Sequence, residues 1–204
     1  MGSEVLVFGS LNADLVFPVE RLPGAGETVI CPGHAVYPGG KGANQAVAAA
    51  RAGAAVAMAG CVGPDGFGAL LEESLARAGV EVSLLRRVGA ATGCAAIAVD
   101  RKGGNQIVVG GGANLCARAD DVPDARLGPA TTLLLQMEVA PAENWALVRR
   151  AHARGARVVL NLAPAAAVPP EALVLVDVLA VNEGEAMALA RYVGEEQGDP
   201  LAAA

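Results

Sequence analysis

The chain has 204 residues, of which 53% are hydrophobic and 18% are charged, a composition typical of a folded globular protein. The formal net charge of −6 argues against a nucleic-acid partner, because acidic side chains outnumber the cationic ones that would neutralise phosphates. With no uninterrupted apolar stretch of about 18 residues and no basic signal-peptide region, the sequence predicts a cytoplasmic protein without a membrane partner.

Short apolar runs alternate with helical patterns along the chain. The first run is Glu4–Gly9, and later ones are Ala55–Cys61, Thr132–Met137, Ala156–Asn161 and Val176–Val181. Helices are predicted at Lys41–Ala52, Gly66–Ala78, Pro141–Ala153 and Glu185–Arg191. The first three of these end at a glycine, which is a common helix stop signal. Because alternation at these lengths is typical of βαβ units, we predict an α/β fold in which helices flank a mostly parallel sheet.

Two stretches interrupt this alternation with additional strands. Leu15–Tyr37 contains two extended pieces around a turn-rich segment, and Gly93–Val109 contains two more, joined by turn residues as in a hairpin. These strands predict a small inserted β-sheet, which we interpret as a lid over a binding cleft; an extension of the main sheet is the alternative. The predicted main domain comprises residues 1–14, 38–92 and 110–204, and the lid comprises residues 15–37 and 93–109.

The segment Pro38–Ala46 carries the densest signal for a binding site. Its glycines allow a ligand to approach the backbone closely, and the following helix start offers unpaired N–H groups, with Lys41 and Asn44 as further donors. The spacing differs from that of a P-loop, because Gly42 rather than serine or threonine follows Lys41. A dinucleotide-binding G-x-G-x-x-G pattern is also missing after the first strand. Generic close packing is the alternative role for these glycines.

Polar residues follow several of the predicted strands. In chain order they are Asn12 with Asp14, Glu138, Asn161, and Asn182 with Glu185. The carboxyl ends of parallel strands meet at one edge of the sheet, where open α/β sheets bind ligands. An ionised Asp14 can accept hydrogen bonds from two neighbouring hydroxyl groups, which suits a polyol. A purely turn-forming role is the alternative for Asn12 and Asp14.

Cysteine, histidine and arginine residues indicate no additional site. The four cysteines are widely separated along the chain, and His34 and His152 are the only histidines, so no Cys/His metal site is predicted. We interpret the basic cluster of Arg149, Arg150 and Arg154 as a solvated helix face.

Four motifs together resemble the ribokinase family of carbohydrate kinases, also called the pfkB family. In chain order they are Gly9–Asp14, Gly39–Ala46, Gly63–Gly68 and Asn182–Glu185. Their order and separations fit that family over essentially residues 4–192, with smaller similarities at Gly111–Asn114 and Asn161–Ala165. The resemblance implies a ribokinase-like α/β domain with a β-lid that also mediates homodimerisation.

The resemblance also implies roles for individual residues. The hydroxyl groups of a small-molecule sugar would be bound by Asn12, Asp14, Gly40, Lys41, Asn44 and Glu138. Asn182 and Glu185 match the family's N-x-x-E motif, which organises Mg²⁺ and the phosphates of ATP largely through water, with Glu185 as the Mg²⁺ residue. The implied reaction is ATP-dependent phosphorylation of a sugar. D-ribose to D-ribose 5-phosphate is the first candidate, and another sugar or a nucleoside is the alternative substrate.

One part of the family pattern is missing from the sequence. A later G-A-G-D-type motif carries the family's general base, and Gly198-Asp199 does not match it, because the second glycine and a following helix are lacking. We therefore assign no catalytic residue and expect the base, the nucleotide-binding part and a monovalent-cation (K⁺) site beyond Ala204. Such a truncated chain is expected to be inactive alone, so a non-catalytic sugar-binding or pseudokinase fragment is a further alternative.

Overall fold

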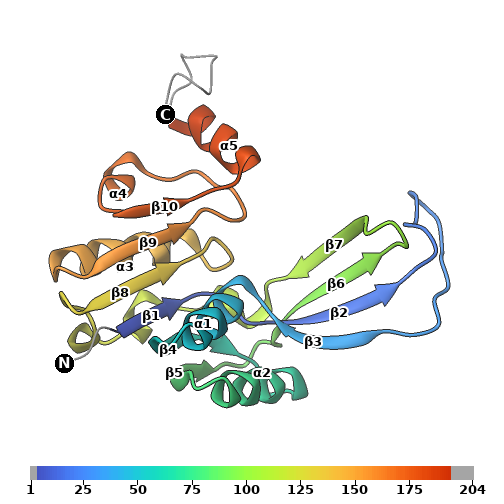
Figure 1. Cartoon of the computed structure of the whole chain (residues 1–204), viewed down its shortest axis with the longest axis horizontal. Helices are drawn as coiled ribbons and strands as arrows, with labels where there is room; N and C mark the ends of the chain where they lie inside the picture. Colours follow the sequence, from blue (N-terminus) through green and yellow to red (C-terminus); the bar gives the residue numbers. More distant parts are fainter. Residues whose placement is uncertain (1–3, 194–204) are drawn as a thin grey trace.

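The computed structural model describes residues 4–193 and centres on a six-stranded sheet (Figure 1). The strands of this main sheet are β1 (Glu4–Phe8), β4 (Ala55–Val62), β5 (Glu81–Arg87), β8 (Thr131–Leu135), β9 (Arg157–Asn161) and β10 (Val178–Ala180). They follow the order β10-β9-β8-β1-β4-β5, and every neighbouring pair is parallel. The predicted mostly parallel α/β sheet is confirmed, and β1 lies in its interior between β4 and β8.

Helices cover both faces of the main sheet. They are α1 (Lys41–Arg51), α2 (Gly66–Arg77), α3 (Pro141–Ala153), α4 (Pro170–Leu173) and α5 (Glu183–Val193). Successive side chains of a strand point to opposite faces, so Val7 packs with Leu71 of α2, whereas Leu6 and Phe8 pack with Leu147 of α3. Two apolar cores therefore share the central strand. None of the helices in residues 4–193 combines the length and the apolar composition needed to cross a membrane.

A second, smaller sheet extends away from the main one (Figure 1). Its strands are β2 (Asn12–Pro18), β3 (Ala35–Gly39), β6 (Gly93–Val99) and β7 (Asn105–Gly110). They follow the order β3-β2-β6-β7, with β2 and β6 parallel and the other two pairs antiparallel. The predicted inserted sheet and the β6–β7 hairpin are confirmed.

The structure differs from the sequence-based expectations at several boundaries. Strand β2 begins at Asn12, so Asn12 and Asp14 belong to the small sheet, although the predicted division placed residues 1–14 in the main domain. Only Gly9–Leu11 separates β1 from β2, which leaves no loop to mark the change of sheet. Strand β5 was not predicted, because it lies at the sheet edge and ends in two arginines rather than in an apolar run. Residues 194–204, including Gly198-Asp199, lie outside the described residues.

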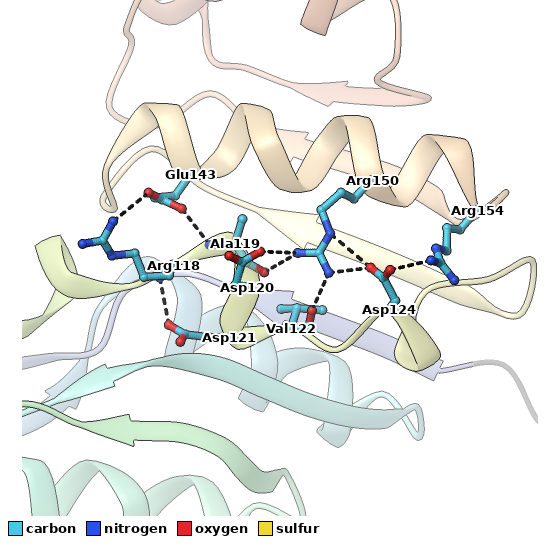
Figure 2. Close-up of polar contacts among 9 residues, drawn as sticks. All are labelled: Arg118, Ala119, Asp120, Asp121, Val122, Asp124, Glu143, Arg150 and Arg154. Carbon is cyan, nitrogen blue, oxygen red and sulfur yellow. Dashed lines mark hydrogen bonds and ion pairs between the residues drawn. The ribbon is translucent and has the colours of Figure 1, made fainter.

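The interpretation of the Arg149, Arg150 and Arg154 cluster as a solvated face is wrong for Arg150 (Figure 2). Its guanidinium donates to the carbonyl oxygens of Ala119 and Val122 at 2.7 and 2.8 Å and to Asp124 Oδ1 at 2.5 Å. Arg154 also pairs with Asp124. Arg150 therefore ties α3 to the short 3₁₀ turns Ala119–Asp121 and Asp124–Arg126, whereas Arg149 is exposed.

Candidate sugar-binding site

A pocket of about 150 Å³ lies between the small sheet and the start of α1. It is lined by Asn12, Asp14, Gly40, Lys41, Asn44, Ala95, Ile97, Ile107, Val109 and Glu138. All six residues that the sequence predicted to bind sugar hydroxyls are therefore brought together in one pocket, although they come from three separate stretches of the chain. The small sheet supplies Asn12, Asp14 and the apolar residues, while the α1 start and the segment after β8 supply the remainder.

Glu138 is held in place by three donors at the edge of the main sheet. Its Oε2 accepts from Ser10 Oγ at 2.6 Å and from the Lys41 backbone N at 3.1 Å, and its Oε1 lies 3.3 Å from Lys41 Nζ. The side chain is only 14% exposed, so these partners offset the cost of burying the carboxylate. Ser10 Oγ in turn accepts from Gly42 N at 3.2 Å. The start of α1 and the carboxylate are thus fixed relative to each other.

Asp14 is a second carboxylate in the same pocket. Its side chain packs against Gly39, whose missing Cβ would lie 2.1 Å from Asp14 Oδ2. Burial and repulsion from Glu138 raise the pKa of Asp14 above its ordinary value, and the nearby Lys41 ammonium partly offsets this rise. Two carboxylates and one ammonium group therefore face the pocket, so the pocket offers both acceptors and donors to hydroxyl groups.

Asn12 lines the pocket and is 3% exposed. Its Oδ1 accepts from Asn114 Nδ2 at 2.8 Å. Asn114 is itself buried, accepts from Leu11 N at 2.9 Å and donates to Leu11 O at 3.1 Å. The backbone segment that carries Asn12 is therefore locked to the 3₁₀ turn Gly112–Cys116, which follows β7.

An apolar surface completes the pocket. The strand register places Asp14 beside Ala95 and Ala95 beside Val109, so these residues share one face of the small sheet. The sequence did not indicate the four apolar lining residues Ala95, Ile97, Ile107 and Val109 or the two supporting residues Ser10 and Asn114. Ser10 and Asn114 each stand in a motif that the resemblance had singled out, whereas the apolar residues gave no signal beyond their strand pattern.

Asn182 and Glu185 do not line this pocket. They form a reciprocal capping box at the start of α5, because Asn182 N donates to Glu185 Oε2 and Glu185 N donates to Asn182 Oδ1, both at 2.8 Å. Within residues 4–193 no cluster of three or more His, Cys, Asp or Glu side chains could hold a metal directly. Side-chain oxygens that already accept backbone N–H groups suit a metal held through water, as Mg²⁺ can be, rather than a cage of protein ligands.

The motif Gly63–Gly68 serves the scaffold rather than the pocket. Asp65 caps α2 by accepting from Gly68 N at 2.9 Å, and it also accepts from Thr92 N at 2.8 Å and Thr92 Oγ1 at 2.6 Å. Hydrogen bonds from the Thr92 hydroxyl and then the Thr92 amide hold the pKa of Asp65 below its ordinary value. Because Thr92 directly precedes β6, this residue pair links the main body to the small sheet.

Comparisons with known proteins match the family and the fold. The sequence model for pfkB family carbohydrate kinases matches residues 3–204. Ribokinase from Haemophilus influenzae is 37% identical over 207 residues, an alignment that covers 100% of this chain and 68% of that protein. Ribokinase from Thermotoga maritima superposes with a TM-score of 0.89 at 32% identity, covering 99% of this chain and 67% of that one. The structure of Arabidopsis thaliana ribokinase complexed with ribose and ATP superposes with a TM-score of 0.81 at 31% identity. This match covers 93% of this chain and 63% of that one.

These similarities place the chain among the carbohydrate kinases with a ribokinase-like α/β fold. The chain belongs to the pfkB family. The resemblance expected from the four motifs is confirmed. The chain spans about two thirds of the length of the relatives that it matches.

Proposed function

We propose that this chain binds a small sugar through its hydroxyl groups and serves in ATP-dependent phosphorylation of that sugar, with D-ribose as the first candidate and D-ribose 5-phosphate as the product. One observation carries the proposal: the predicted binding residues converge on a single pocket in which two carboxylates, an ammonium group and two amides stand beside apolar side chains. The similarity to the Arabidopsis ribokinase complexed with ribose and ATP supports both ribose and ATP as ligands.

The pocket chemistry suits a polyol. Asp14 and Glu138 accept hydrogen bonds from hydroxyl groups, and Lys41 Nζ donates to them. The apolar residues of β6 and β7 suit the C–H surface of a sugar ring and limit the access of water.

Phosphoryl transfer requires groups that this sequence does not supply in recognisable form. No G-A-G-D-type motif occurs in the 204 residues, so we propose that this chain alone binds the sugar without turning it over at an appreciable rate.

Mg²⁺, when bound, would neutralise charge on the phosphates of ATP, and Glu185 would hold it through water, since Glu185 Oε2 is engaged in the capping box. The K⁺ site and the cytoplasmic location stay predictions.

Isothermal titration with D-ribose, D-fructose and adenosine tests the sugar assignment. We expect ribose to bind best, and Asp14→Asn to weaken ribose binding by about 10- to 100-fold, because a charged acceptor is lost. Ribose affinity of the natural chain should fall as the pH drops through the raised pKa of Asp14. Asp120→Asn is the matched control, because that side chain is 96% exposed and lies outside the pocket.

The stability of Asp14→Asn separates a binding role from a structural one. Because the native pKa of Asp14 lies above the unfolded one, its contribution to stability is fully present below the unfolded pKa and is lost as the pH rises through the native pKa. Removing the charge should therefore leave the free energy of unfolding at pH 7 unchanged or raised. Ribose that binds no better than fructose or adenosine would contradict the ribose assignment. Robust ATP-dependent turnover by the 204-residue chain would contradict the proposed need for a further segment.

We further propose that the small sheet mediates homodimerisation. Its face opposite the pocket carries a row of four apolar residues that the register places side by side, namely Val36, Leu15, Ala96 and Val108. Val108 is 73% exposed. The small sheet projects from the main sheet and its helices (Figure 1). An exposed apolar face in this position favours burial against a second copy of the chain.

A further inference from the structure

We infer that Asn114 is a positioning residue that fixes which end of the Asn12 amide faces the sugar, and thereby makes Asn12 a hydrogen-bond donor in the pocket. Asn114 is 1% exposed and does not line the pocket, so it acts only through Asn12 and the backbone of Leu11. The inference rests on the proposed sugar-binding function and adds a specificity determinant to it.

The orientation of the Asn114 amide is set by the main chain. A backbone N–H can only donate and a carbonyl oxygen can only accept, so Leu11 N must face Asn114 Oδ1 and Leu11 O must face Asn114 Nδ2. These contacts are 2.9 and 3.1 Å long. Because Leu11 offers one group of each kind, a rotated Asn114 amide would oppose donor to donor and acceptor to acceptor. Only one orientation of Asn114 is therefore compatible with its surroundings.

The fixed amide of Asn114 then dictates that of Asn12. Asn114 Nδ2 lies 2.8 Å from the Asn12 side chain and can only donate, so the Asn12 atom that it meets must be Oδ1. Gly93 makes room for this contact, since a Cβ there would lie 2.3 Å from both Asn114 Nδ2 and Asn12 Oδ1. Among the described residues no acceptor is found for Asn12 Nδ2, and this group is left for the pocket.

A donor at this position matters because of its neighbours. Asp14 and Glu138 both present carboxylate acceptors to the same pocket. A sugar hydroxyl that donates to one of these carboxylates still has oxygen lone pairs, which Asn12 Nδ2 can satisfy. If the Asn12 amide were reversed, its Oδ1 would stand beside two carboxylates and repel the same hydroxyl oxygen. Asn114 thus selects for hydroxyl groups, which can donate and accept together.

Two substitutions separate this role from a purely structural one. Asn114→Asp keeps the acceptor for Leu11 N and replaces the donor by an acceptor, which draws the Asn12 NH₂ group away from the pocket. Asn114→Ala leaves both Leu11 groups without their partner, but it leaves Asn12 free to keep its NH₂ group toward the sugar. We expect ribose affinity to fall about tenfold or more in Asn114→Asp and less in Asn114→Ala. Asn105→Asp, on the exposed β7 strand, is the matched control.

Side-chain amide exchange measured by NMR without any sugar tests the orientation independently of function. The Asn114 NH₂ protons should be protected, whereas the Asn12 NH₂ protons should exchange rapidly and should shift when D-ribose is added. Protected Asn12 NH₂ protons in the free protein would overturn the inference, even if Asn114→Asp fails to fold. Ribose affinity that is lower in Asn114→Ala than in Asn114→Asp would overturn it as well. The natural protein could instead show the expected exchange and bind no ribose. That result would contradict the proposed function but would support the inferred orientation of Asn12.

Discussion

At the scale of single residues, Gly40 limits what the pocket can tolerate. Its φ of 89° is a conformation that side-chain-bearing residues rarely adopt, and an added Cβ would lie 2.7 Å from Asn12 N and 2.9 Å from Ser10 O. These are backbone atoms that cannot move aside without displacing the pocket itself. Gly40→Ala should therefore lower the free energy of unfolding by more than the about 1 to 3 kcal/mol expected from backbone strain alone, measured by urea denaturation.

Gly53→Ala is the matched control for this substitution. Gly53 has a similar φ of 92°, but no atom lies within 4 Å of its added Cβ. The difference between the two variants therefore isolates the steric contribution at Gly40. Equal losses of stability in Gly40→Ala and Gly53→Ala would contradict the close approach of α1 to the segment Ser10–Asn12.

The sequence allowed the polar residues of the pocket to be predicted, but not the residues that orient them. Asp14, Lys41 and Glu138 have side chains whose chemistry indicates a ligand. The sequence pattern places Asp14 and Glu138 after predicted strands and Lys41 at a predicted helix start. Ser10 and Asn114 gave no comparable signal, because their roles arise from contacts with residues 128 and 102 positions away. Such contacts depend on sheet order, which local pattern does not determine.

At the scale of elements, Arg150 joins α3 to the preceding 3₁₀ turns (Figure 2). A lysine at this position could not reach two carbonyl oxygens and the Asp124 carboxylate together, because it lacks the planar fork of the guanidinium. We expect Arg150→Lys to lower the free energy of unfolding by about 1 to 2 kcal/mol, measured by urea denaturation. Arg149→Lys changes the neighbouring exposed residue of the same helix and should cost almost nothing. Similar losses for both would show that the contacts of Arg150 add no stability.

Element type was predictable from the sequence wherever apolar periodicity and turn residues agreed. Helix α3 was predicted with its observed ends, because Pro141 begins it and Gly155 follows it closely. The short helix α4 and the three 3₁₀ turns were not predicted, since each is too short to show a helical period. These short elements depend on tertiary contacts such as those of Arg150.

At the scale of the whole molecule, the proposed dimer depends on the outward face of the small sheet. Val108→Lys places a charge in the apolar row formed with Leu15, Val36 and Ala96, so it should convert a dimer to a monomer in size-exclusion chromatography with light scattering. Val174→Lys is the matched control, because Val174 is 78% exposed but follows α4 on the main body. A natural chain that is monomeric at all concentrations, or a Val108→Lys variant that stays dimeric, would contradict the proposed interface.

Because β1 lies in the interior of the main sheet, the cores on its two faces can fold at different times during synthesis. The core on the Val7 face draws on no buried residue later than Val80, so it can close soon after that residue leaves the ribosome. The face that carries Leu6 and Phe8 is covered only after β8 and α3 have been made, whose buried apolar residues run from Leu133 to Ala151. Until β8 and α3 have been synthesised, one face of β1 is packed in a core and its other face is exposed. A nascent chain paused near residue 100 therefore presents a half-covered sheet, which is the kind of surface that chaperones hold.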